Sequence, residues 1–217
     1  MTRKRISGPE RRALILAAAR RVFSLHGYDG AKTLQIAREA KVSEALVYRH
    51  FPSKLALYRA VMQQVFSEQD NQLEILGIQE ASAAGLVRSL KSYFCTVVAE
   101  TEGDVQQRFR MMLTSLSGDG NYASQLYRRS QRLNNKAVNE AHRNAREAGD
   151  LTGKPLNIAN TAMFIEHVGT MICAIRALDP GSRPYESDGH DLVMDAVWFC
   201  CRGIGLTDEA IARYIDE

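Results

Sequence analysis

Two short helical segments separated by a brief break constrain this chain more than any other feature of its sequence. The first segment runs from Thr33 to Ala40 and the second from Glu44 to His50. Thr33 and Ser43 are placed to cap the two segments, because Ser and Thr hydroxyls accept hydrogen bonds from the free N–H groups at a helix start. Two short helices joined by three or four residues form a helix-turn-helix, and the pattern predicts that motif here.

Helical periodicity continues through the rest of the 217 residues, and strand patterns are nearly absent. A first helix is expected over residues 9–25, opened by a capping box of Ser7 and Glu10 and stopped by Gly27. Longer helices are expected over 83–99, 105–116, 122–148, 155–178 and 191–201. We therefore expect an all-α protein with an N-terminal three-helix helix-turn-helix domain (1–55) and a larger helical domain (56–217).

The charge is distributed unevenly along the chain. Residues 1–60 carry 13 Lys and Arg against 4 Asp and Glu, whereas residues 61–217 carry 15 against 21. A basic first quarter on an acidic remainder suggests that one end meets a polyanion, although a chance skew of a solvated surface is the alternative. Within the basic segment 1–8, Arg3, Lys4 and Arg5 either reach into a minor groove as an arm or form a solubilising tail.

The second short helix has a small exposed face suited to the DNA major groove, which admits one helix. Its first side chains, Ser43, Glu44 and Ala45, would point at base edges. Glu44 could accept from cytosine N4, or could serve only the positive end of the helix dipole. Donors suited to phosphate oxygens surround this helix: Lys32, Thr33, Tyr48, His50 and Lys54. His50 has a second interpretation as a packing residue.

The stretch ILAAARRVFSLHGYDGAKTLQIAREAKVSEALVYRHFPSKLALYRAV resembles the DNA-binding domain of the TetR family of transcriptional regulators. Spacing and residue type agree at many positions within residues 10–65. The resemblance implies backbone contacts by Thr33, Tyr48, His50 and Lys54, and base contacts by Ser43, Glu44, Ala45 and Arg49.

The sequence departs from the family at Lys41, where TetR-like proteins usually have glycine in the turn. A left-handed backbone there would cost a lysine about 1 kcal/mol. The lysine side chain could also add a phosphate contact, so Lys41 joins the expected DNA-binding residues.

A seven-residue probe reads few base pairs, so specific binding needs two copies spaced about 34 Å apart or a multiple of it. This argues for a homodimer on a palindromic operator. The resemblance implies an interface made by the last two long helices. The expected interface residues, which could instead form the core of the domain, are Ile165, Val168, Gly169, Ile172, Val193, Val197 and Trp198.

The resemblance also implies a small-molecule effector in the C-terminal domain, whose binding releases the protein from DNA and so relieves repression. Each candidate for the effector site could equally be ordinary core or surface: Tyr93, Phe94, Phe109, Met112, Met163 and His167 as lining, with Arg108, Glu166 and Arg176 as polar anchors. The alternative is a DNA-binding regulator without an effector, controlled by its abundance or by a protein partner.

Other classes of function lack their motifs. There is no H-x-x-x-H, Gly-rich phosphate loop or G-x-S-x-G, so we expect no enzyme and no catalytic, metal or cofactor site. We see no stretch of roughly 18 uncharged apolar residues and no signal peptide. Four cysteines without C-x-x-C spacing suit reduced, buried thiols. We expect a cytoplasmic protein whose partners are double-stranded DNA, a second copy and a small molecule, with no membrane.

Overall fold

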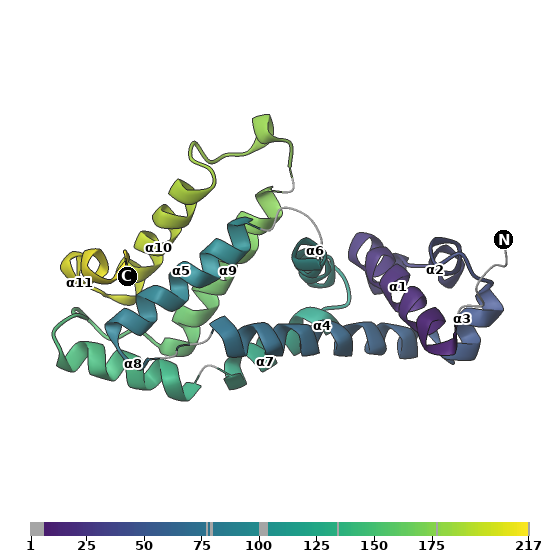
Figure 1. The fold of residues 1–217 in the computed structure, drawn as a ribbon, viewed down its shortest axis with the longest axis horizontal. Coiled ribbons are helices and arrows are strands. Elements are labelled where there is room, and N and C mark those ends of the chain that lie inside the picture. Colours follow the sequence, from purple (N-terminus) through teal and green to yellow (C-terminus); the bar gives the residue numbers. More distant parts are fainter. Residues whose placement is uncertain are drawn as a thin grey trace. The chain divides into compact units, whose positions relative to one another are not determined.

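A computed structural model describes residues 7–216 of this chain, except 77, 79, 100–103, 134 and 177 (Figure 1). The proposed arm residues Arg3, Lys4 and Arg5 lie outside the described residues. Among those described, β pairing is limited to an isolated bridge between Leu151 and Leu206. The expected all-α class is confirmed. The helices are α1 (Gly8–Gly30), α2 (Thr33–Glu39), α3 (Glu44–His50), α4 (Lys54–Leu76), α5 (Ala83–Ala99), α6 (Asp104–Leu116), α7 (Asn121–Leu133), α8 (Asn135–Glu147), α9 (Ile158–Arg176), the 3-10 turn η1 (Pro180–Ser182), α10 (His190–Ile204) and α11 (Asp208–Tyr214).

The chain divides into two compact units. The N-terminal unit comprises Met1–Asn71 and Gln107–Leu126, and the C-terminal unit comprises Gln72–Gln106 and Tyr127–Glu217. The N-terminal unit therefore contains α1–α3 and most of α4, together with most of α6 and the first part of α7. The expected domain boundary between residues 55 and 56 stays a prediction.

The first helix begins with the predicted capping box. Ser7 Oγ accepts the backbone N–H of Glu10, and the Glu10 carboxylate accepts that of Ser7 at 2.7 Å. Gly27 breaks the helix with φ +65° and ψ −176°, and one further turn continues to Gly30. Thr114 of α6 lies against the break, since its Oγ1 is 3.2 Å from the Ser24 carbonyl oxygen. A Cβ on Gly27 would lie 2.9 Å from Thr114 Cγ2, so both backbone and space require glycine there.

Aromatic contacts hold the core of the N-terminal unit together. Phe23 of α1 packs edge-on against Tyr58 of α4, with ring centroids 4.9 Å apart. Tyr122 of α7 is fully buried and stacks on Phe66 of α4 at 5.4 Å. The stacked pair explains why α7 starts within this unit, because each ring removes the other's apolar surface from water.

Helix α5 lies at the centre of the C-terminal unit, where it packs against α8, α9, α10 and α11 (Figure 1). Its inward residues Val87 and Phe94 are fully buried, as are Val197 of α10 and Ile211 of α11. One helix was expected over 122–148, but the structure has two, α7 and α8.

The cysteines follow the expectation at three of four positions. Cys173, Cys200 and Cys201 are buried, whereas Cys95 is exposed. Burial raises the pKa of Cys201 to about 12 and that of Cys200 to about 11, so both thiols stay protonated and unreactive at neutral pH.

Candidate functional site

The two helices of the predicted motif pack against each other and share a hydroxyl pair at their surface. The hydroxyls of Thr33 and Tyr48 lie 3.0 Å apart. Ser43 caps α3 as predicted, accepting the Leu46 N–H at 3.2 Å. Thr33 was wrongly expected to cap α2: that position belongs to Lys32, whose N–H donates to Gln35 Oε1 at 2.9 Å. The Gln35 side chain accepts the backbone N–H at the start of α2, and the Thr33 hydroxyl instead lies within hydrogen-bond distance of the Tyr48 hydroxyl.

Helix α3 hides one side and offers the other to solvent. Val47 is buried, whereas Ala45, Tyr48 and Arg49 are exposed and Glu44 is half-buried. Tyr48 keeps 44% of its surface exposed although its hydroxyl is hydrogen-bonded. A short helix with small and polar side chains on its open face can enter a major groove.

Basic side chains surround this face. Lys32 and Lys41 are exposed, and His50 and Lys54 are half-buried. Lys54 is held at the start of α4, where its Nζ donates to the Asp29 carbonyl at 3.2 Å and lies 4.7 Å from the Tyr28 ring centroid. Within the described residues, no carboxylate pairs with Lys32, Lys41 or Lys54. Their charges are therefore available to an anion, and the free N–H groups at the start of α4 add to the positive potential.

The candidates for an effector site are divided between the two units. Arg108, Phe109 and Met112 belong to the N-terminal unit, and Tyr93, Phe94, Met163, Glu166 and His167 to the C-terminal unit. Phe94 is wholly buried in the core, and His167 is exposed with its Nε2 2.9 Å from the Tyr127 hydroxyl. Arg176 pairs with Asp188 and so holds the loop before α10.

A cavity of about 180 Å³ lies within the C-terminal unit, lined mainly by α5, α8 and α9. Tyr93 and Glu166 are the two candidates that line it. The sequence did not indicate the other lining residues, because no local pattern shows that α8 packs beside α5. These other lining residues are Ile78, Leu86, Ser89, Leu90, Val138, His142, Ile158, Thr161, Ala162, Ile165 and Ile204. A carboxylate within the most apolar helix, α9, is the one signal in the sequence that pointed to this site.

Glu166 and Tyr93 form the polar centre of the cavity. The Tyr93 hydroxyl donates to Glu166 Oε2 at 3.3 Å. Burial raises the pKa of Glu166, and the hydrogen bond from Tyr93 opposes that rise only in part. Gly169, expected at a dimer interface, is instead the place where Tyr93 crosses α9: a Cβ there would lie 2.1 Å from the Tyr93 oxygen.

The raised pKa of Glu166 predicts a pH-dependent effect of Glu166→Gln on stability. Below the ordinary pKa of 4.5, both proteins carry a neutral side chain and should be equally stable. As the pH rises, the unfolded wild-type chain loses this proton more readily than the folded one, so the wild type loses stability through the raised pKa. At neutral pH the glutamine variant should be more stable by on the order of 1 kcal/mol, raising Tm by about 2–4 °C.

Thermal unfolding followed by circular dichroism at neutral pH and near pH 4.5 measures this effect. Glu147→Gln, on the exposed end of α8, is the control and should change nothing. A Glu166→Gln protein that is less stable than the wild type at neutral pH would contradict the argument, because the ionised carboxylate would then have stabilising contacts that outweigh its burial.

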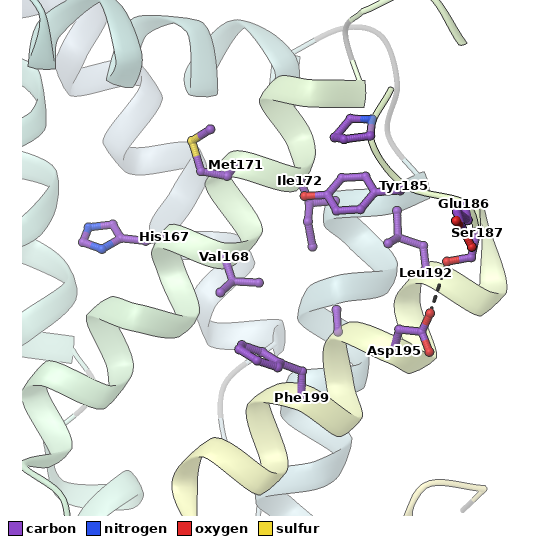
Figure 2. A pocket seen from close by; sticks show the side chains of 12 residues that line it. His167, Val168, Met171, Ile172, Tyr185, Glu186, Ser187, Leu192, Asp195 and Phe199 are labelled. Atoms are coloured by element: carbon purple, nitrogen blue, oxygen red, sulfur yellow. Dashed lines mark hydrogen bonds between the residues drawn. The ribbon is translucent and has the colours of Figure 1, made fainter. Parts of the chain in front are cut away.

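A second, open hollow lies between α9, α10 and the loop before α10, with a volume of about 760 Å³ (Figure 2). His167 and Met171 of α9 and Phe199 of α10 line it, and Ser187 of the loop donates to Asp195 at 3.1 Å. We refer to it as the α9–α10 groove. Phe199 is 68% exposed, and Phe164, one turn before Val168 on α9, is 63% exposed.

Two of the expected interface residues, Val168 and Ile172, line this groove. Gly169, Ile172, Val193 and Val197 are buried in the core of the unit, and Ile165, Val168 and Trp198 are half-buried. Trp198 also has the Arg202 guanidinium 4.9 Å from its ring centroid. Sequence periodicity found the apolar helices but could not divide their faces between the core and an interface. The outward apolar residues are Phe164, Met171 and Phe199.

Comparison with known proteins matches the N-terminal domain to one family. Residues 15–61 match the bacterial regulatory proteins of the tetR family. A segment of 59 residues is 48% identical to the HTH-type transcriptional activator FasR of Mycolicibacterium smegmatis (strain ATCC 700084 / mc(2)155), covering 27% of each chain. The N-terminal domain of this chain belongs to the TetR family. The helix-turn-helix of α2 and α3 is thus a TetR-family DNA-binding motif.

Two further similarities extend this result. Over 82 residues, 38% of this chain and 40% of the other, the sequence is 34% identical to the HTH-type transcriptional repressor DhaR of Mycobacterium sp. (strain GP1). The chain thus spans about a quarter to two fifths of the length of these curated relatives. A TetR-like regulator from Rhodococcus sp. RHA1 shares the fold at a TM-score of 0.62 and 19% identity, covering 92% of this chain and 100% of that one.

The turn of this TetR-family motif contains the expected strained lysine. Lys41 has φ 55°, and among the described residues it is the only non-glycine residue with a positive φ. Lys41→Gly should remove a strain of about 1 kcal/mol, partly offset by the greater entropy of glycine in the unfolded chain. We expect a net gain of about 0.5 kcal/mol in the free energy of unfolding, together with weaker DNA binding if the side chain contacts phosphate.

Urea denaturation of Lys41→Gly and Lys41→Ala separates the two effects. Both variants lose the charge, but alanine keeps the strained backbone, so only the glycine variant should be stabilised. Equal stability of the two variants would show that the left-handed turn costs nothing here.

Proposed function

We propose that this chain is a cytoplasmic, sequence-specific DNA-binding transcriptional regulator that acts as a homodimer on a palindromic operator. The observation that carries the proposal is the helix-turn-helix of a TetR-family domain, whose α3 exposes one face to solvent. Lys32, Lys41 and Lys54 surround this face, and within the described residues none of them forms an ion pair with a carboxylate. Ser43, Glu44, Ala45 and Arg49 are assigned to the bases. Phosphates are assigned to Lys32, Thr33, Lys41, Tyr48, His50 and Lys54.

Selection of binding sites from a random duplex pool, followed by a salt titration on the selected duplex, tests the proposal. The expected result is a two-fold palindrome whose log affinity falls steeply against log salt, because each phosphate contact releases counterions. Equal binding to every sequence, or enrichment of none, would contradict it. The titration is run on the full chain, so the result does not depend on the N-terminal unit folding alone.

The homodimer is assigned to the α9–α10 groove. Helix α9 has 19 residues and a mean hydropathy of 1.4, yet only 28% of it is buried within the chain. By length and composition it is apolar enough to cross a membrane, but core helices of soluble proteins meet the same criterion. Met171 and Phe199 line the groove, and Phe164 is exposed on the same helix as Met171, so these apolar side chains offer area that a second copy can cover in a two-fold interface.

Phe199→Glu is expected to weaken the dimer by at least about 100-fold, because two-fold symmetry places the buried charge in the interface twice. Sedimentation velocity over a range of concentrations measures the shift from dimer to monomer. Leu156→Glu is the matched control, since Leu156 is 55% exposed in the same unit but outside the groove. A Phe199→Glu protein that stays dimeric at low micromolar concentration would show that the α9–α10 groove is not the dimer interface.

An effector is assigned to the cavity of the C-terminal unit, where it acts by favouring the DNA-incompetent state. A shift from 1:99 to 99:1 needs about 5.5 kcal/mol of differential binding. We assign repression as the mode of action, with release from DNA when the effector binds. Transcription from the selected operator, measured with and without the protein, tests this assignment: an increase in transcription on adding protein would make it an activator.

A further inference from the structure

The cavity of the C-terminal unit carries a carboxylate that no cation of its described lining compensates. Among the described residues that line it, Glu166 is the only acid, and no Lys or Arg is present. Within the described part of the chain, the Tyr93 hydroxyl is the polar partner of Glu166, at the long distance of 3.3 Å. Glu166 is half-buried beside aliphatic walls, and a carboxylate partly removed from water is stabilised by an opposite charge, so the site favours a ligand with a positive group.

Two further polar groups of the cavity direct a proton to a backbone carbonyl and not to the cavity. Thr161 donates its hydroxyl proton to the Asn157 carbonyl at 3.0 Å. His142 Nδ1 lies 2.9 Å from the Val138 carbonyl oxygen, which can only accept, so that nitrogen carries a proton and directs it to the backbone. Tyr93 directs its proton to Glu166. A ligand that supplies several donors and a positive charge complements this set.

Size limits the rest of the ligand. The cavity volume of about 180 Å³ is close to that of cavities that hold a benzene-sized molecule. The walls are aliphatic, with Leu86 and Leu90 from α5 and Ile165 from α9. A hydrocarbon group of six to eight carbons fills such a space, and a larger body would require the helices to separate.

We propose that this cavity binds a small apolar primary amine, whose ammonium group pairs with Glu166 and whose hydrocarbon part lies against Leu86, Leu90 and Ile165. An ammonium group has three donors and no acceptor, which matches the Glu166 carboxylate and the Tyr93 and Thr161 hydroxyl oxygens, whose protons are directed to other groups. Tyr93 acts as a positioning residue: it crosses α9 at Gly169 and directs its hydroxyl at Glu166. This inference rests on the proposed role of the C-terminal unit as the effector domain.

Isothermal titration calorimetry on the full chain at neutral pH tests the proposal with benzylamine, n-hexylamine, benzyl alcohol and benzoate. Benzylamine and benzyl alcohol share the ring and differ in the charged group, so their ratio isolates the ion pair. We expect benzylamine to bind at least about tenfold more tightly than benzyl alcohol, and benzoate not to bind, because a buried charge pair favours one sign. The n-hexylamine titration shows whether the ring is required.

Three variants locate the binding. Glu166→Gln should abolish the preference for the amine over the alcohol, whereas Glu147→Gln, outside the cavity, should keep it. Ala162→Leu reduces the cavity volume while Glu166 stays in place, so it should weaken amine and alcohol alike. The proposal is overturned if neither amine binds, if benzyl alcohol or benzoate binds as tightly as benzylamine, or if Glu166→Gln retains the preference.

A second measurement separates this inference from the proposed function. The selected operator duplex is titrated with protein in the absence and presence of saturating benzylamine. Operator binding without any amine binding would leave the DNA-binding function in place and reject the ligand class. Glu166-dependent amine binding by a protein that selects no operator would retain the ligand class and reject the regulator.

Discussion

Replacing Gly27 with alanine is expected to destabilise the N-terminal unit by about 2–4 kcal/mol. The backbone at Gly27, with φ +65° and ψ −176°, lies in a region that is essentially reserved for glycine. The added Cβ would also meet Thr114 Cγ2 at 2.9 Å, on a side chain held against the Ser24 carbonyl. Strain and overpacking therefore act at the same position. Since domains are stable by about 5–15 kcal/mol, the variant should approach unfolding at physiological temperature.

Gly30→Ala is the matched control for this prediction. Gly30 lies three residues later and has an ordinary φ, and its Cβ would approach the His26 Cβ no closer than 3.5 Å. We expect its stability to stay within about 0.5 kcal/mol of the wild type. Chemical denaturation of the three proteins, followed by circular dichroism, gives the comparison. If both alanine variants lose little free energy of unfolding, the backbone break in α1 can form without glycine, and the Thr114 side chain can move to accept the added Cβ.

Tyr48→Ala is expected to weaken operator binding by at least about 30-fold, or about 2 kcal/mol, because each protomer of the proposed dimer loses a contact. Tyr48 is 44% exposed on the open side of α3 and shares a hydrogen bond with Thr33 of α2. The variant removes the expected phosphate contact of Tyr48 and frees the Thr33 hydroxyl from its hydrogen-bond partner, without opening a cavity in the core. Fluorescence anisotropy with the selected duplex at constant salt measures the change.

Two controls sharpen the interpretation of Tyr48→Ala. Tyr48→Phe keeps the ring and removes the hydroxyl, so its loss divides the effect between the two parts. Arg143→Ala removes an exposed cation from α8 in the C-terminal unit and should leave affinity unchanged. Operator affinity that survives in Tyr48→Ala, or that falls equally in Arg143→Ala, would mean that general charge and not the α3 surface carries the binding.

The sequence predicted those features that depend on neighbouring residues. The Ser7–Glu10 capping box, the Ser43 cap, the break at Gly27 and the left-handed Lys41 all arise within a few residues of backbone. Such interactions have a fixed spacing, so residue types at that spacing reveal them. The exception, Thr33, shows the limit: its hydroxyl bonds Tyr48, fifteen residues away, while Gln35 interacts with Lys32.

Contacts between distant segments were not predictable in the same way. Gly169 was assigned to close helix approach in a dimer, but the group that needs the space is Tyr93, on α5 of the same chain. The interface residues Ile172, Val193 and Val197 were chosen for their apolar character, which core and interface share; burial within the unit distinguishes the two. The cavity was partly foreseen at Tyr93 and Glu166, but its α8 wall depends on packing that leaves no local pattern.

The discontinuous make-up of the N-terminal unit limits how such a protein can be recombined. The chain passes from one unit to the other after residues 71, 106 and 126. A fragment cut after α4 would leave Phe66 without the Tyr122 ring that covers it, and the Gly27 break without Thr114. Chimeric regulators that join this DNA-binding domain to a foreign sensor should therefore carry residues 107–126 with it. A single junction behind α4 would yield hybrids that aggregate, and an operator-specific hybrid would need three splice points.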